Sequence, residues 1–252
     1  MIISFYTVGT PYEVEANALV KSLKALKIPH EIAGLPNQGS WVKNCAMKAR
    51  FVRDFRRDYH KPFWWLDADA ELCKPLPDLS STPVDLAAYQ TDGWNLRSGC
   101  VFFGMTDNTN AILDLWVDYA ERFPIVWDQL LLRIAMHNQN AKSPVTFMEL
   151  PESYYKKASR KWHKEVQNRA LEMIGLRDKP VVRQNQASRR LKKLLDGKAN
   201  QLKTKLEVSG NHLPPNIRSL LSESGSESVN LDTVVPLMVA ASNREIEPSS
   251  AH

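Results

Sequence analysis

The feature that most constrains the fold is the stretch 63–69, Phe-Trp-Trp-Leu-Asp-Ala-Asp, where a run of bulky apolar residues ends in two carboxylates. Four large apolar residues in a row predict a strand buried on both faces, as in a parallel sheet covered by helices. Asp67 and Asp69 cannot continue into that core, because an unpaired buried carboxylate is costly. Ligands of open α/β sheets bind at the carboxyl ends of the strands. The stretch therefore predicts a ligand site, and paired carboxylates suit a hard divalent cation bound to a diphosphate.

The first 150 residues alternate between strand and helix patterns. The predicted strands are residues 2–7, 30–35, 63–66, 85–89, 100–103 and 145–149. The predicted helices begin after Thr10-Pro11 and cover residues 44–59, 108–123 and 128–137. This rhythm predicts an α/β fold with a central, mostly parallel sheet.

Charge is unevenly distributed along the 252 residues. Residues 151–205 hold 16 Lys and Arg against 5 Asp and Glu, a balance of +11, whereas residues 1–150 balance at −2. Two basic helices are predicted in this block, at 159–173 and 187–205. Such a block favours contact with phosphate groups, on a nucleotide, a nucleic acid or a membrane surface.

The last part of the chain changes in composition. Residues 206–252 balance at −4, and residues 222–228 read Ser-Glu-Ser-Gly-Ser-Glu-Ser. Low complexity of this kind predicts a flexible tail. We therefore expect a domain over residues 1–205, with 151–205 as its basic helical part, followed by a flexible tail over 206–252.

The expected cellular compartment follows from sequence patterns that are absent. No run of about 18 apolar residues is present, and the N-terminus has no basic region followed by an apolar one. The three cysteines, Cys45, Cys73 and Cys100, form neither a disulfide framework nor a zinc pattern. We expect a cytoplasmic protein with reduced thiols, or one of the host cytoplasm if a phage encodes it.

Four segments, in this order, resemble glycosyltransferases of the GT-A fold, the nucleotide-diphosphosugar transferase superfamily. They are Ser4-Phe5-Tyr6-Thr7, Trp65-Leu66-Asp67-Ala68-Asp69, Arg97-Ser98-Gly99-Cys100-Val101-Phe102-Phe103 and Trp127-Asp128-Gln129-Leu130. The last two resemble glycogenin-like and lipopolysaccharide transferases. The likeness covers about residues 1–155. It implies a Rossmann-like α/β/α fold, here extended by basic helices, and a hexosyltransferase that uses a nucleotide-sugar, with a UDP-sugar favoured.

The resemblance implies a donor site and a metal site. The matching donor-binding residues are Phe5, Tyr6, Thr7, Asp67, Ser98 and Gly99. Asp67 and Asp69 would bind Mn²⁺ or Mg²⁺. The superfamily usually adds a His from a later segment, but residues 181–190 contain none. Gln184 or Asn185 is therefore expected in that place, through a carbonyl oxygen.

Basic side chains are expected to offset the charge of the leaving diphosphate. Lys48 and Arg50 precede the acidic motif on a predicted helix, and Arg189 and Arg190 would close over the donor as a lid. For both pairs a solvated helix face is the alternative. Trp41, Trp94 and Tyr154 are expected either to stack on a base or sugar or to lie in the core.

Asp128 and Gln129 are the expected catalytic residues. Asp128 would position the acceptor hydroxyl or take its proton. Asp before Gln129-Leu130 also suits a helix N-cap, and the two roles are compatible. Asp128 as a base favours inversion, whereas the resemblance favours retention, to which we lean.

The sequence does not determine which molecule is the acceptor. The basic block also fits a nucleic-acid-binding protein without transferase activity. An enzyme that adds sugar to a modified base of phage DNA would combine both functions. Attachment to a membrane through the same block is a third possibility. A nucleotidyltransferase ranks lower, because Thr7-Val8-Gly9-Thr10 has only one glycine.

Overall fold

The structure is a computed structural model that describes residues 1–159, 161–185, 187, 208–223 and 227–244. Its central sheet has the strand order β2-β1-β3-β6-β5-β7. The strands are β1 (Ile2–Thr7), β2 (His30–Leu35), β3 (Phe63–Leu66), β5 (Leu86–Thr91), β6 (Asn95–Phe103) and β7 (Phe147–Glu149). Strand β6 is antiparallel to its neighbours β3 and β5, and the other pairings are parallel. The prediction of a mostly parallel α/β sheet is confirmed.

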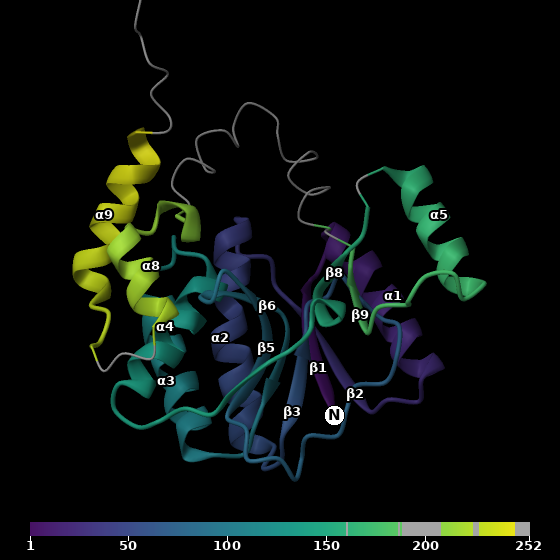
Figure 1. Ribbon diagram of the computed structural model, residues 1–252, viewed down its shortest axis with the longest axis horizontal. Coiled ribbons are helices and arrows are strands. Elements are labelled where there is room, and N and C mark those ends of the chain that lie inside the picture. The colour runs from purple at the N-terminus through teal and green to yellow at the C-terminus, as the bar shows by residue number, and fades with distance from the viewer. Residues whose placement is uncertain (160, 186, 188–207, 224–226, 245–252) are drawn as a thin grey trace, which may run out of the picture.

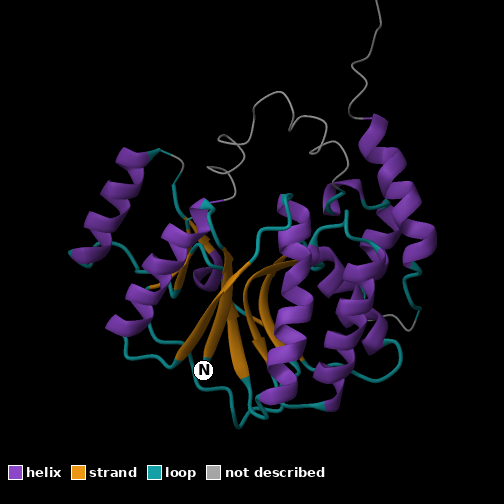
Figure 2. Cartoon of the chain, turned by 180° about the vertical axis from the view of Figure 1, so that it is seen from behind, coloured by secondary structure: helices purple, strands orange, loops and turns teal. Residues whose placement is uncertain are grey.

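Helices cover both faces of this sheet (Figure 1, Figure 2). They are α1 (Pro11–Ala25), α2 (Trp41–Asp58), α3 (Asp107–Arg122) and α4 (Asp128–Asn140). Side chains of β3 alternate between the two cores. Phe63 and Trp65 pack with α2, α3 and α4, and Trp64 and Leu66 pack with α1. All four are buried, as the apolar run predicts, and the result is a three-layer α/β/α architecture.

A second, smaller sheet lies next to the acidic motif. It has the order β4-β9-β8, with β4 (Ala70–Leu72), β8 (Lys156–Lys157) and β9 (Val182–Gln184). Strand β4 begins immediately after Asp69 and pairs antiparallel with β9. A short 3₁₀ helix, η1 (Glu152–Tyr155), leads into β8, and helix α5 (Trp162–Met173) lies between β8 and β9. This sheet attaches residues 152–184 to the end of β3.

The C-terminal part corrects the prediction of a flexible tail over 206–252. Residues 208–223 and 227–244 contain η2 (Gly210–His212), α8 (Pro215–Ser222) and α9 (Leu231–Arg244). Their buried apolar side chains join the core of α3 and α4, and these are Val208, Leu213, Leu221, Val229, Leu231, Val234, Val235 and Met238. The helices on either side of the Ser-Glu stretch, α8 and α9, are therefore packed against the core.

Polar contacts hold this C-terminal part in place. The Asn138 side chain accepts a hydrogen bond from the N–H of Val229 and donates one to its carbonyl, at 2.7 and 2.8 Å. The N–H of Trp127 donates to the carbonyl of Val208 at 3.1 Å. Residues 208–244 thus bury the outer faces of α3 and α4. Their composition alone suggested a solvated tail.

Of the two predicted basic helices, the first corresponds to α5, and the second, at 187–205, lies almost entirely outside the described residues. Among the helices of the described residues, none combines the length and the apolar character that a membrane span requires.

Candidate active site

A pocket of about 380 Å³ opens at the carboxyl ends of β1 and β3. Small-molecule sites have volumes of about 300–1,000 Å³. Its wall includes ten side chains that the sequence predicts for the site, namely Phe5, Tyr6, Thr7, Lys48, Asp67, Asp69, Ser98, Asp128, Gln129 and Gln184. The structure therefore brings together residues from six separate segments at the place that the acidic motif predicts.

Lys48 is a buried cation at the centre of this pocket. Its Nζ lies 2.8 Å from Asp67 Oδ1 and 2.9 Å from Asp128 Oδ2, and it donates to Ser98 Oγ at 3.1 Å. The ammonium also lies 5.2 Å from the ring centroid of Trp65. Burial acts to lower the pKa of Lys48, but the charges of Asp128 and Asp67 outweigh burial and raise it well above its ordinary value. Lys48 therefore stays protonated.

Asp128 faces the pocket but is not the N-cap of α4, so the expected N-cap role is wrong. The N-cap position of α4 is Trp127, which makes no side-chain capping bond, and Asp128 is the first residue of the helix. Its Oδ2 accepts a hydrogen bond from Ser98 Oγ at 3.0 Å in addition to the ion pair with Lys48. Its carboxylate is thus fixed in one orientation toward the pocket.

The two carboxylates of the acidic motif are held in different ways. Asp67 Oδ1 accepts from Trp65 Nε1 at 2.9 Å. Asp69 Oδ2 accepts from the N–H of Ala187 at 2.7 Å, and its carbonyl accepts from the N–H of Asn185 at 2.9 Å. Burial, and then the neighbouring charge of Asp67, raise the pKa of Asp69 to about 6. The chain that follows β9 therefore fixes Asp69 beside a second negative charge.

Gly99 leaves room for three side chains to converge. A Cβ at this position would lie 2.8 Å from Tyr155 Cε2, 2.9 Å from Gln184 Nε2 and 3.1 Å from Asp67 Oδ2. The amide nitrogen of Gln184 donates to the carbonyl of Gly99 at 3.2 Å. Because glycine has no side chain, β6 approaches the acidic motif closely, and this explains the Ser-Gly pair in the sequence.

The donor atoms fit a divalent cation. Repulsion between Asp67 and Asp69 contributes to the raised pKa of Asp69, and a cation would relieve it. Gln184 could add its carbonyl oxygen, since its amide nitrogen is engaged. Within the described residues no group of three or more His, Cys, Asp or Glu is placed to hold a metal ion. Two carboxylates and one amide suit Mn²⁺ or Mg²⁺ whose other ligands are water and phosphate.

Some predicted residues lie elsewhere. Arg50 is exposed, pairs with Glu121 and does not line the pocket, so its donor-binding role is not supported. The Asn185 side chain turns to Glu15 at 3.5 Å. Trp41 lines the pocket, but Tyr154 stacks on Trp64 within the core. Trp94 packs against the C-terminal part, under the Arg218 guanidinium. The predicted lid residues Arg189 and Arg190 lie outside the described residues.

The pocket also contains side chains to which the sequence assigned no role. They include Tyr12, Cys45, Arg97, Trp127, Tyr155 and Lys157. Burial, and then the charge of Asp67, raise the pKa of Tyr155 to about 12, so its phenol is a hydrogen-bond donor at neutral pH. Arg97 begins one of the segments that resemble glycosyltransferases, and Lys157 lies in the basic block 151–205, so the resemblance and the charge were the signals that could have pointed to them.

Comparisons with known proteins identify the fold that carries this site. No protein-family model matches the chain, and no curated protein sequence does. A crystal structure of a glycosyltransferase involved in the glycosylation of the major capsid of PBCV-1 matches with a TM-score of 0.52 and 12% identity, over 73% of this chain and 91% of that one. Mouse xyloside xylosyltransferase 1 in its apo form matches with a TM-score of 0.39 and 10% identity, over 74% and 97% of the two chains.

The match to the PBCV-1 structure concerns the fold, because identity is low. It covers most of that structure and agrees with the three-layer architecture of the central sheet. The chain therefore has a GT-A-type glycosyltransferase fold, as the four sequence segments predict.

Proposed function

We propose that the chain is a glycosyltransferase that moves a sugar from a nucleotide-diphosphate sugar, with a UDP-sugar favoured, to an acceptor hydroxyl. The observation that carries this proposal is the pocket at the ends of β1 and β3, in which Asp67, Asp69 and Lys48 converge. The fold that the chain shares with a glycosyltransferase supports it.

The polar groups of the pocket suit the charges of this reaction. Negative charge develops on the leaving diphosphate, and fixed positive charge nearby stabilises it. Arg97 and Lys157 line the pocket and would contact the diphosphate. Phe5, Tyr6 and Thr7 at the end of β1 would hold the nucleoside. Asp67, Asp69 and Gln184 would hold Mn²⁺ or Mg²⁺, which when bound would offset the charge of the diphosphate.

Lys48 has a more specific role in this proposal. Since it bonds to both Asp67 and Asp128, it joins the donor side of the pocket to the side where α4 begins. Asp128 and Gln129 would then orient hydroxyls of the sugar or acceptor. Because Lys48 and Ser98 hold the Asp128 carboxylate, this side chain is positioned before any substrate binds.

Isothermal titration with UDP and Mn²⁺ tests the proposal. Binding of UDP should require Mn²⁺ or Mg²⁺ and should be lost in Asp69→Asn, whereas the matched variant Asp54→Asn, on α2 away from the pocket, should bind as the wild type does. Mass spectrometry of donor hydrolysis across sugar nucleotides then identifies the sugar. Failure of every sugar nucleotide to bind with metal present, together with no effect of Asp69→Asn, would refute the function.

DNA as the acceptor rests on the basic charge of residues 151–205 alone. Within the described part of this block, Arg169 and Arg183 are engaged by glutamates, and Lys156 pairs with Glu152. These pairs reduce the charge available to a polyanion. We therefore leave DNA out of the proposed function, and a salt-dependent gel shift would bring it back.

A further inference from the structure

Helix α5 has its charged face toward the protein and its apolar residues toward solvent. A surface helix ordinarily buries its apolar stripe. In α5 no residue is buried, and Trp162, Val166 and Met173 are exposed, with Trp162 at 77% and Met173 at 86%. Their spacing places them on one side of the helix. Ile174 and Leu176, just after the helix, are exposed as well.

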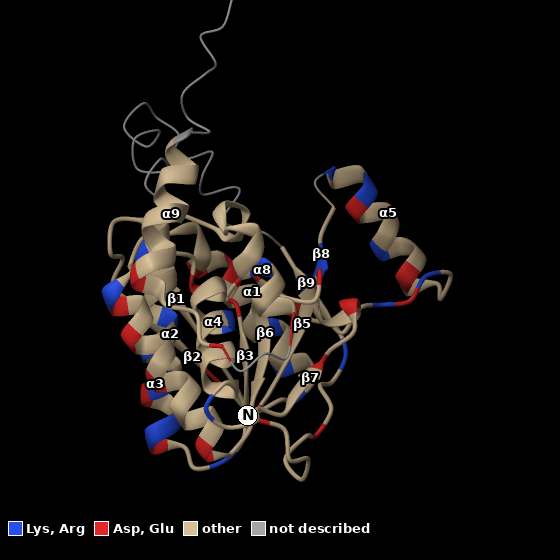
Figure 3. Cartoon of the chain, turned by 60° about the vertical axis from the view of Figure 1, so that its left-hand side comes forward, with Lys and Arg blue, Asp and Glu red and all other residues tan. Residues whose placement is uncertain are grey.

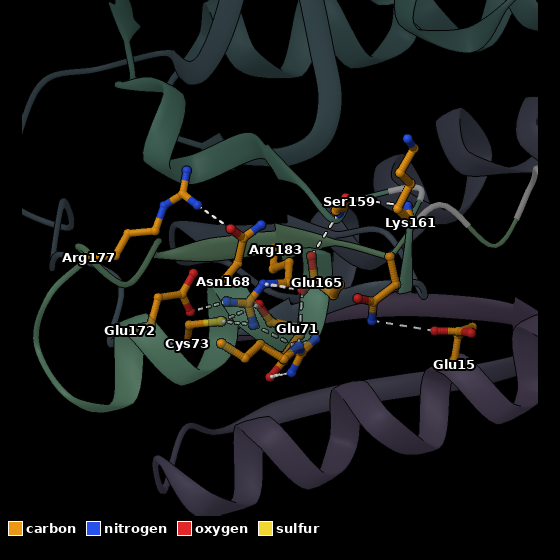
Figure 4. A network of polar contacts seen from close by, with 12 residues as sticks. Glu15, Glu71, Cys73, Ser159, Lys161, Glu165, Asn168, Glu172, Arg177 and Arg183 are labelled. Carbon is orange, nitrogen blue, oxygen red and sulfur yellow. Dashed lines mark hydrogen bonds and ion pairs between the residues drawn. The ribbon is translucent and has the colours of Figure 1, made fainter. Parts of the chain in front are cut away.

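Ion pairs, rather than apolar contacts, hold α5 to the body (Figure 4). Arg183 of β9, whose side chain is buried, pairs with Glu172 and, at 3.4 Å, with Glu165. Arg183 also lies 3.1 Å from Glu71 of β4, and Arg169 of α5 lies 2.7 Å from the same carboxylate. Glu165, Arg169 and Glu172 are thus engaged on the inside, whereas Trp162, Val166 and Met173 remain exposed to solvent.

The surroundings of this apolar side are basic. Four cations are exposed on and beside the helix: Lys161 precedes it, Lys164 lies on the face opposite Trp162 and Val166, and Arg177 and Lys179 follow it, with Asp178 between them. Figure 3 shows both Lys and Arg (blue) and Asp and Glu (red) on α5, with its other residues in tan. An apolar face that includes a tryptophan, with exposed Lys and Arg on the other face and at both ends, is the composition of a helix that lies in a membrane interface with anionic lipid.

The position of α5 makes its apolar side accessible to a flat surface. The helix projects from the layered body on β8 and β9, and both Figure 1 and Figure 2 show it standing apart. A single helix of this kind can also fit the apolar groove of a protein partner, and the exposed Lys and Arg on and beside α5 favour a surface of phosphate groups instead. A planar lipid surface can be bound through the exposed apolar side of α5 alone.

We propose that α5 binds an anionic membrane surface through Trp162, Val166, Met173, Ile174 and Leu176, with Lys161, Lys164, Arg177 and Lys179 contacting lipid phosphates. Strands β8 and β9 carry Lys157 and Gln184 of the pocket, so a docked α5 places the pocket close to the membrane. If the proposed function holds, the acceptor is then a hydroxyl presented at a membrane surface.

Vesicle flotation of the full chain tests this proposal. We expect flotation with vesicles of phosphatidylcholine and phosphatidylglycerol at 3:1, little with phosphatidylcholine alone, and a decrease as salt increases. Val166→Asp with Met173→Asp should abolish it. Leu237→Asp, a matched change at an exposed apolar residue of α9, should not.

A charge series makes the test specific to α5, because residues 188–207 are also rich in Lys and Arg. Lys161→Glu with Lys164→Glu should weaken partitioning by about fivefold for each basic charge removed. Lys21→Glu with Lys24→Glu, exposed on α1, should have no such effect. Flotation that the α5 variants leave unchanged would overturn the proposal, as would a concentration-dependent dimer or a DNA gel shift that is lost in these variants instead.

UDP titration on the same variants separates this proposal from the proposed function. None of the substituted residues lines the pocket, so UDP binding should be unchanged in them. Loss of flotation with intact UDP binding supports the membrane surface. Flotation without any sugar-nucleotide binding would support the membrane surface and refute the glycosyltransferase.

Discussion

Lys48 is the residue on which the pocket most depends. It is the cation that lies between the buried carboxylate of Asp128 and the carboxylate of Asp67. Removing one partner of a buried ion pair leaves the others without compensation, which costs more than the pair itself contributes.

We therefore expect Lys48→Met to lower the free energy of unfolding by about 3 kcal/mol, measured by urea denaturation at pH 7. Lys43→Met, an exposed position on the same helix, should change it by less than about 0.5 kcal/mol. Equal free energies of unfolding for Lys48→Met and Lys43→Met would show that the Asp128 carboxylate is tolerated in the core without the Lys48 ammonium.

Asp69 gives the metal-free protein a characteristic pH dependence. Its pKa in the folded chain is about 6, above the ordinary value of 3.8. Between these values the folded state holds a proton that the unfolded state releases, so this group's contribution to stability falls as pH rises from about 4 to about 6. At pH 7 the ionised Asp69 is destabilising.

Asp69→Asn should therefore be more stable than the wild type at pH 7 in the presence of EDTA, and this advantage should shrink as pH falls toward 4. Urea denaturation of both proteins across this range measures the difference. A variant that is less stable at pH 7 would contradict the raised pKa. The same variant should lose Mn²⁺-dependent UDP binding, so stability and function would change in opposite directions.

Residues that follow a strand were predictable, and residues on helices were less so. Asp67, Asp69 and Ser98 lie in or just after strands of one sheet, and chain order alone brings such positions to one edge. Lys48 and Arg50 were predicted as a pair, yet residues two apart on a helix point about 200° apart. Only one of them can face the pocket. The buried apolar neighbours Ala49 and Val52 indicate that it is Lys48, which lies on the buried side of the helix.

At the scale of elements, Arg183 makes most of the ion pairs that attach α5, and Arg169 adds one to Glu71. Arg183 contacts Glu71, Glu165 and Glu172, and it is the buried member of this cluster. The helix has no buried residue of its own to replace these contacts.

Arg183→Met should release α5, with faster amide exchange in residues 162–173 and little change in α1 or α3. Hydrogen exchange with mass spectrometry measures it. Arg177→Met is the matched control, since Arg177 is exposed and bonds only within this segment, to Asn168. Unchanged protection of α5 in Arg183→Met would mean that other contacts hold the helix.

Helix α9 is the element that the composition of the sequence did not predict. Leu231, Val234, Val235 and Met238 follow a helical spacing and are all buried. The Ser-Glu stretch before them dominates the composition of the C-terminal part and suggests flexibility. Periodicity within residues 231–238 carried the correct signal, whereas the face of α3 and α4 that receives it cannot be identified from sequence.

At the scale of the whole molecule, residues 208–244 complete the main core. They bury eight apolar side chains against it, each worth about 1.5–3 kcal/mol. Before the entropy of ordering these residues is subtracted, this burial amounts to about 12–24 kcal/mol, which exceeds the net stability of a typical domain, about 5–15 kcal/mol.

A chain that ends at residue 206 should therefore not fold, whereas one that ends at residue 244 should melt as the full chain does. Soluble yield and thermal melting followed by circular dichroism measure both. A folded 1–206 chain that binds UDP would show that residues 208–244 are dispensable, as a flexible tail would be.

The hydrogen bond from Ala187 to Asp69 has a consequence for how the protein is made. The two residues are 118 positions apart. At about 5–20 residues per second of synthesis, roughly 6–24 seconds separate their addition to the growing chain. During that interval the nascent chain lacks the bond that fixes Asp69, and the residues that close its core come later still. The pocket is therefore completed only near the end of translation, and an unfinished chain has no complete site with which to bind a ligand.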